Sequence, residues 1–128
     1  MIALALAIAA APVQPTDGSE PSVGDTEFCD GARIAVESLR ATYPRQVDAV
    51  TRIQNVSLDC AARTMEWTGI ISLKPAQMPV GWMAERQSAW NATTCKGAVL
   101  QAARLGWHFR QTYRFEDGSL SSIDAACP

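Results

Sequence analysis

The chain has 128 residues, of which 48% are hydrophobic and 19% are charged, with four cysteines and a formal net charge of −2. This length predicts one domain, and the apolar share is high enough to pack a core, which excludes disorder throughout. The charge argues against a strongly basic nucleic-acid-binding protein, and the single histidine excludes any site that needs two.

Residues 1–11 carry no charge and match the apolar part of a secretory signal peptide. They are too few for a transmembrane helix, which needs about 20 residues. The basic residues that usually come first are missing, so we expect either a cleaved signal or a start codon that lies upstream. The alternative is a buried helix or strand of the folded domain. The signal-like segment predicts a periplasmic or secreted protein without a transmembrane helix in the mature chain.

Residues 12–27 form an acidic segment with three prolines and two glycines and no apolar period, so we predict a flexible linker. From Gly31 onward the chain has 11 basic and 8 acidic residues. A mildly basic body therefore follows an acidic arm. The arm either serves solubility, folds back on the body or repels an acidic surface.

Residues 28–43 begin the predicted folded domain, which extends to residue 128. Apolar residues recur there at spacings of three and four and predict a helix that ends at Pro44. Two strands of a hairpin are predicted next, at 46–58 and 64–73. Only Ile70 breaks the alternation of the second strand.

In the second half of the chain, two predicted helices precede two predicted strands. Residues 82–95 and 98–105 predict two helices, and residues 107–115 alternate as a strand. The sequence Glu-Asp-Gly at 116–118 predicts a turn, and 119–127 returns as the partner strand. This order predicts an α+β fold, with an antiparallel sheet of about four strands in two hairpins and the helices packed on one face.

The four cysteines, Cys29, Cys60, Cys95 and Cys127, follow a signal-like segment, which is typical of disulfides formed in an oxidising compartment. None of them belongs to a C-x-x-C pair of the kind that zinc sites and redox-active thiols use. We therefore expect two disulfides, no metal and no cofactor. Three connectivities remain open at this point.

Five other residues are candidates for a site. His108 shares a strand face with Arg110 and Arg114, and a carboxylate could orient it as a general base only if the strand order allowed. We expect no catalytic residue. Together with Arg52, the two arginines predict a basic patch, which is either an ordinary solvated face or a surface for an acidic protein or polymer. Trp82, at a predicted helix start, is the candidate exposed aromatic residue.

Part of the chain, residues 43–128, carries a set of short motifs in a fixed order. They are Tyr43-Pro44, the stretch 47–51, a hairpin, a helix ending in Cys95, Gly106, aromatic alternation through Tyr113, Asp117-Gly118 and a terminal Cys127. This part resembles a class of small, mostly uncharacterised bacterial secreted or lipoprotein-like α+β domains. The resemblance implies a disulfide between Cys95 and Cys127, which leaves Cys29 with Cys60, and it implies no particular activity.

Together these features predict an exported, non-catalytic domain with a binding or structural role in the bacterial cell envelope. The expected partner is an envelope protein or an acidic polymer, and not a nucleic acid. An inhibitor or immunity-type protein that blocks a partner enzyme is the first alternative. A small hydrolase is the second.

Overall fold

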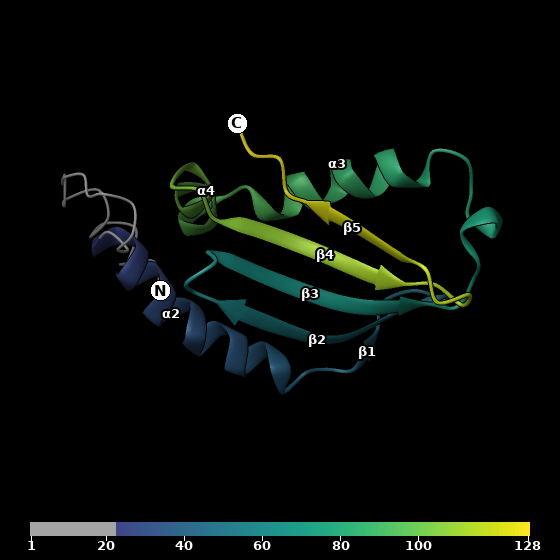
Figure 1. Cartoon of the computed structure of the whole chain (residues 1–128), viewed down its shortest axis with the longest axis horizontal. Helices are drawn as coiled ribbons and strands as arrows, with labels where there is room; N and C mark the ends of the chain where they lie inside the picture. Colours follow the sequence, from purple (N-terminus) through teal and green to yellow (C-terminus); the bar gives the residue numbers. More distant parts are fainter. Residues whose placement is uncertain (1–22) are drawn as a thin grey trace.

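The computed structural model describes residues 23–128 (Figure 1). The predicted signal-like segment and residues 12–22 of the predicted linker lie outside the described residues. Within residues 23–128, no helix is both long enough and apolar enough to span a membrane. The elements in chain order are α2 (Val23–Arg40), β1 (Arg45–Gln46), β2 (Thr51–Asp59), β3 (Thr64–Ile71), the 3-10 helix η1 (Pro75–Gln77), α3 (Trp82–Thr94), α4 (Gly97–Arg104), β4 (His108–Arg114) and β5 (Leu120–Asp124).

The strands form one sheet in the order β1-β2-β3-β4-β5. β2 with β3 and β4 with β5 are antiparallel hairpins, as predicted, whereas β3 and β4 run parallel. The long connection through α3 and α4 returns the chain to the starting end of β3, which is what a parallel pair requires. The predicted α+β class is confirmed. The prediction of an antiparallel sheet of about four strands is corrected in two respects. The sheet of the described residues has a fifth strand, β1, which is only two exposed residues long and so shows no alternation in the sequence. In addition, β3 and β4 pair in parallel.

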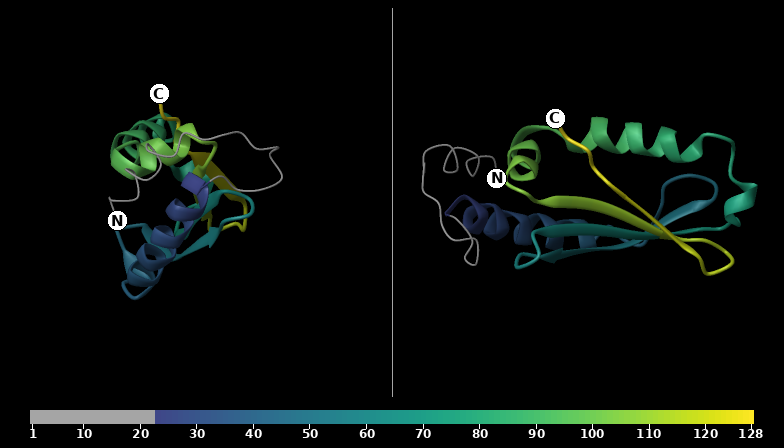
Figure 2. Two further views of the ribbon diagram at one scale, coloured as in Figure 1. Left: turned by 90° about the vertical axis from the view of Figure 1, so that its left-hand side faces the viewer. Right: turned by 45° about the horizontal axis from the view of Figure 1, so that its top comes forward.

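Helices α2, α3 and α4 pack against one face of the sheet, which we name the inner face (Figure 2). Side chains from α2, α4, β2, β3 and β4 share one buried cluster there, and α3 adds a partly buried tryptophan. The opposite, outer face carries mostly polar side chains. The main cluster contains Phe28, Cys29, Ala32, Val36, Val56, Met65, Ala102, Trp107 and Phe109.

Helix α2 begins at Val23, earlier than predicted, and ends at Arg40. The last residues of the predicted linker are therefore helical. Asp25 explains the early start, because its carboxylate is buried, accepts a hydrogen bond from Trp107 Nε1 at 2.9 Å and lies 2.8 Å from Arg63 Nη2. Asp25 and Trp107 are 82 residues apart in the sequence, and a contact between such distant residues leaves no pattern in the local sequence.

The turn between β4 and β5 sets the register of the last hairpin. Gly118 has a φ of 87°, the left-handed conformation that the Asp-Gly pair predicts. Hydrogen bonds from the hydroxyl and backbone N–H of Ser119 lower the pKa of the Asp117 carboxyl. The closed turn places Arg114 opposite Leu120.

Candidate binding surfaces

Two disulfides fasten helical segments to the sheet. Cys29 in α2 is bonded to Cys60, directly after β2, with the Cα atoms 5.9 Å apart. Cys95, directly after α3, is bonded to Cys127, with the Cα atoms 5.4 Å apart. Both separations are ordinary for disulfides, and no free cysteine is left. The pairing is the one that the resemblance favours.

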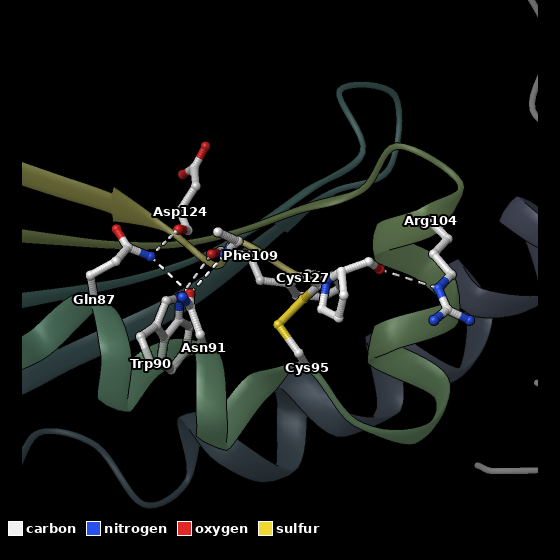
Figure 3. The surroundings of a disulfide bond; sticks show 10 residues. Gln87, Trp90, Asn91, Cys95, Arg104, Phe109, Asp124 and Cys127 are labelled. Atoms are coloured by element: carbon white, nitrogen blue, oxygen red, sulfur yellow. Dashed lines mark hydrogen bonds between the residues drawn. A yellow bond between two sulfur atoms is a disulfide. The ribbon is translucent and has the colours of Figure 1, made fainter.

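Helix α3 is also joined to the end of β5 by side-chain amides (Figure 3). Gln87 Nε2 donates to the Asp124 carbonyl oxygen at 2.8 Å, and Asn91 Oδ1 accepts from the Ala126 N–H at 2.8 Å. On the same side of the helix, the Trp90 indole donates to the carbonyl oxygen of Phe109 at 2.9 Å. These contacts and the second disulfide fasten α3 to β4 and to the segment that follows β5.

An open pocket of about 260 Å³ lies between α3 and the inner face of the sheet. Four of its residues come from α3 and two from β4. None of them is among the site residues predicted from the sequence, because their neighbourhood depends on how α3 crosses the sheet. The lining residues are Arg86, Ala89, Trp90, Thr93, Gln111 and Tyr113.

Arg86 brings a positive charge into this pocket, next to the aromatic Trp90 and Tyr113. Its guanidinium carbon lies 4.9 Å from the centre of the Tyr113 ring and 6.0 Å from that of Trp82. Its Nη2 donates to the buried Thr51 hydroxyl at 3.1 Å and lies 3.9 Å from the Asp48 carboxylate. The side chain is still 23% exposed. A held but accessible guanidinium beside aromatic rings is suited to a carboxylate on an otherwise apolar ligand.

Tyr113 lies directly on the sheet because residue 69 is a glycine. A Cβ at Gly69 would come within 2.9 Å of the Tyr113 ring and 2.8 Å of the Arg52 carbonyl oxygen. Burial raises the pKa of the Tyr113 phenol, although the Arg86 charge acts against that rise. At neutral pH the phenol is therefore uncharged. The pocket floor is thus a neutral aromatic surface with one cation next to it.

The Asp48 carboxyl next to Arg86 makes the stability of the folded protein depend on pH. Its burial raises its pKa, but hydrogen bonds from Val50 and Thr51 and the nearby Arg86 outweigh this effect, and the pKa lies below its ordinary value of 3.8. A lowered folded-state pKa adds stability above the unfolded-state pKa, and this stability is lost as the pH falls through the folded-state value. Asp48→Asn should therefore lower the Tm at pH 7, and its gap to the wild type should narrow below about pH 4. Thermal unfolding followed by circular dichroism from pH 7 to pH 2 measures this, and a gap that is constant with pH would contradict it.

The four polar candidates predicted from the sequence all lie on the outer face. His108, Arg110 and Arg114 are every second residue of β4 and so share one face. Arg52 lies on the same face, because it is opposite Ile70 of β3, which is in turn opposite Arg114. Trp82 is not with them, because it lies at the start of α3 on the other side of the sheet. It is also half-buried rather than fully exposed, with its ring packed edge-on at 5.6 Å against another aromatic ring.

His108 is poorly placed for acid–base chemistry. Its Nδ1 lies 3.6 Å from Asp124 Oδ2, outside hydrogen-bonding distance. Arg110 engages both oxygens of that carboxylate, at 2.7 and 3.3 Å, and the hydrogen bond raises the pKa of the guanidinium. Among the residues that the structure describes, no cluster of three or more His, Cys, Asp or Glu side chains could hold a metal ion.

The fold is shared with small bacterial proteins of known structure. A pilotin from the type 2 secretion system of Vibrio vulnificus aligns with a TM-score of 0.54 and 20% identity, over 78% of this chain and 86% of its own. A protein of Pseudomonas aeruginosa described as secreted aligns with a TM-score of 0.59 and 12% identity, over 83% of this chain and 96% of its own. No family model and no curated protein sequence matches the chain. At these identities the likeness shows the fold.

Proposed function

We propose that this protein is exported and acts in the bacterial cell envelope by binding a segment of a partner protein, without catalysis. Two disulfides support exposure to an oxidising compartment, and the signal-like residues 1–11 support export. The shared fold with a secretion-system pilotin and with a protein described as secreted supports a role as an accessory protein of the envelope.

The pocket above β4 is the observation that carries the proposal. Its volume of about 260 Å³ is below the roughly 300–1,000 Å³ of typical small-molecule sites, and it is open to solvent. It suits one or two side chains of a larger partner. Trp90 of α3 and Tyr113 on the pocket floor supply apolar surface, whereas Arg86 and Gln111 supply polar groups. The matching ligand is an amphipathic protein segment that inserts an apolar side chain and directs a carboxylate to Arg86.

Photo-crosslinking at the pocket tests this proposal in the native cell. Ala89 lines the pocket and is exposed, so a photoreactive phenylalanine analogue there should crosslink a specific envelope protein. Mass spectrometry of the product would identify the bound segment, which can be synthesised as a peptide. Ala89→Glu should weaken binding of that peptide by roughly tenfold or more, because it adds bulk and negative charge beside the pocket.

Ala84 supplies the matched control. It is exposed on the same helix and does not line the pocket, so Ala84→Glu changes the charge equally and should leave peptide binding unchanged. Equal crosslinking from positions 84 and 89 would contradict the proposal. So would equal loss of peptide binding in the two glutamate variants.

A further inference from the structure

One row of side chains crosses the outer face at the end of the sheet where β3 and β4 finish. Register places Arg52 of β2 beside Ile70, Ile70 beside Arg114, and Arg114 beside Leu120 of β5. Residues that are directly opposite on neighbouring strands point to the same face. Cation and aliphatic side chain therefore alternate across four strands, and we name this set the outer row.

Arg110 and Thr112, in the middle of β4 on the outer face, are engaged by contacts within the protein. Arg110 is paired with Asp124 at 2.7 Å. Thr112 donates to the Glu66 carboxylate at 2.6 Å and is 2.7 Å from the Ser122 hydroxyl. The side chains of Arg110, Asp124, Thr112 and Glu66 are thus engaged within the protein. They leave little for a partner to bind.

The two cations of the outer row differ from Arg110. Both are exposed, and within residues 23–128 neither Arg52 nor Arg114 has a carboxylate at ion-pair distance. The Arg52 side chain donates a hydrogen bond of 3.3 Å to Gln46 Oε1, an uncharged acceptor. Within this part of the chain, no carboxylate therefore neutralises their charge.

The aliphatic members of the row are exposed where a solvated strand face would carry polar residues. Leu120 is 63% exposed and Ile70 is 37% exposed. Ile70 is also the residue that breaks the alternation of its strand, with an apolar side chain on the polar face. Arginine is enriched at protein interfaces, and the adjacent aliphatic side chains add apolar area, so the outer row has the composition of an interaction surface.

The separation of the two arginines in the outer row matches the spacing of side chains along one side of an α-helix. Neighbouring strands are about 4.8 Å apart, so the two arginines are separated by about 9.6 Å across the sheet. In an α-helix, positions i and i+7 lie about 10.5 Å apart along the axis, with i+3 between them on the same side. We propose that the outer row binds an amphipathic acidic helix of another protein, with carboxylates at i and i+7 facing Arg52 and Arg114. Apolar side chains at i+3 and i+10 then meet Ile70 and Leu120.

A designed peptide tests this proposal directly. The probe is a fluorescently labelled, alanine-based helix of roughly 18 residues with Glu at i and i+7 and Leu at i+3 and i+10. It should bind the wild-type protein in anisotropy titrations, and more weakly as salt screens the charges. Arg52→Glu with Arg114→Glu should weaken binding by at least about tenfold, and Leu120→Ser should weaken it by a smaller factor. A peptide with Lys at the two acidic positions should not bind.

A second pair of substitutions controls for net charge. Arg33→Glu with Lys96→Glu changes two exposed cations away from the outer row and should leave peptide binding unchanged. Equal weakening by both pairs, or equal binding of the acidic and basic peptides, would overturn the proposal. It is also overturned if the peptide fails to bind while vesicles with anionic lipid bind through the same two arginines.

The result is independent of the proposed function. The pocket lies on the inner face, so the Ala89→Glu variant should bind the acidic peptide as the wild type does. Loss of partner binding at the pocket with intact peptide binding would leave the outer row supported. The reverse result would remove the outer row and leave the pocket.

Discussion

Replacing Cys95 and Cys127 together by alanine is expected to destabilise the protein by about 3 to 4 kcal/mol. The disulfide closes a chain separation of 32 residues, and opening it returns loop entropy to the unfolded state. The substitution also releases the segment after β5 from its covalent link to α3, so that only hydrogen bonds such as that from the Ala126 N–H to Asn91 hold it there. Urea denaturation of the variant and the wild type, both without reductant, measures the difference in free energy of unfolding.

The other disulfide is a natural comparison. Cys29 and Cys60 are separated by 31 residues, so the entropy model predicts nearly the same loss for their alanine pair. A loss below about 1 kcal/mol for either pair would show that the unfolded chain is already constrained or that the native bond is strained. Intact mass with and without reductant verifies that both bonds are present in the starting material.

Asp25→Ala is expected to cost about 2 to 3 kcal/mol, because it leaves a buried donor without its acceptor. Trp107 is 4% exposed, and its Nε1 donates to the Asp25 carboxylate. The half-exposed Arg63 loses its ion pair in the same variant, which adds less because water solvates it. Urea denaturation again gives the difference in free energy.

An exposed aspartate on the same helix provides the control. Asp30 pairs with Arg33 at 3.1 Å, with both side chains more than 60% exposed, so Asp30→Ala should change stability by less than about 1 kcal/mol. A chain that starts at residue 28, where the sequence predicts the domain to begin, should be destabilised like Asp25→Ala. If that truncated chain is as stable as the full one, the role assigned to the first turns of α2 is wrong.

Much of the fold could be predicted from local patterns. Period-two alternation identified β3 and β4, helical spacing identified the body of α2, and the Asp-Gly pair identified the last turn. These signals are local because a strand or helix that covers a core must place apolar residues at its own period. The start of α2 and the two-residue strand β1 could not be predicted, since both depend on contacts with distant parts of the chain.

The candidate surfaces divide in the same way. Alternation along β4 predicted that His108, Arg110 and Arg114 share a face. It could not tell that Asp124 neutralises Arg110 and leaves Arg114 available, because that depends on the register of β5. Nor could it find Arg86, whose helix carries no marked apolar stripe and is positioned by the Cys95–Cys127 disulfide and by amide contacts.

The sequence alone determined the α+β class, most element positions and the expectation of disulfides, since each follows from residues near one another in the chain or from composition. Only the tertiary structure decided the parallel pairing of β3 with β4, the pocket under α3 and the outer row. Each of these brings together residues from separate elements through a register or a crossing. A linear sequence does not state which strands become neighbours, and that choice is made by the packing of the whole core.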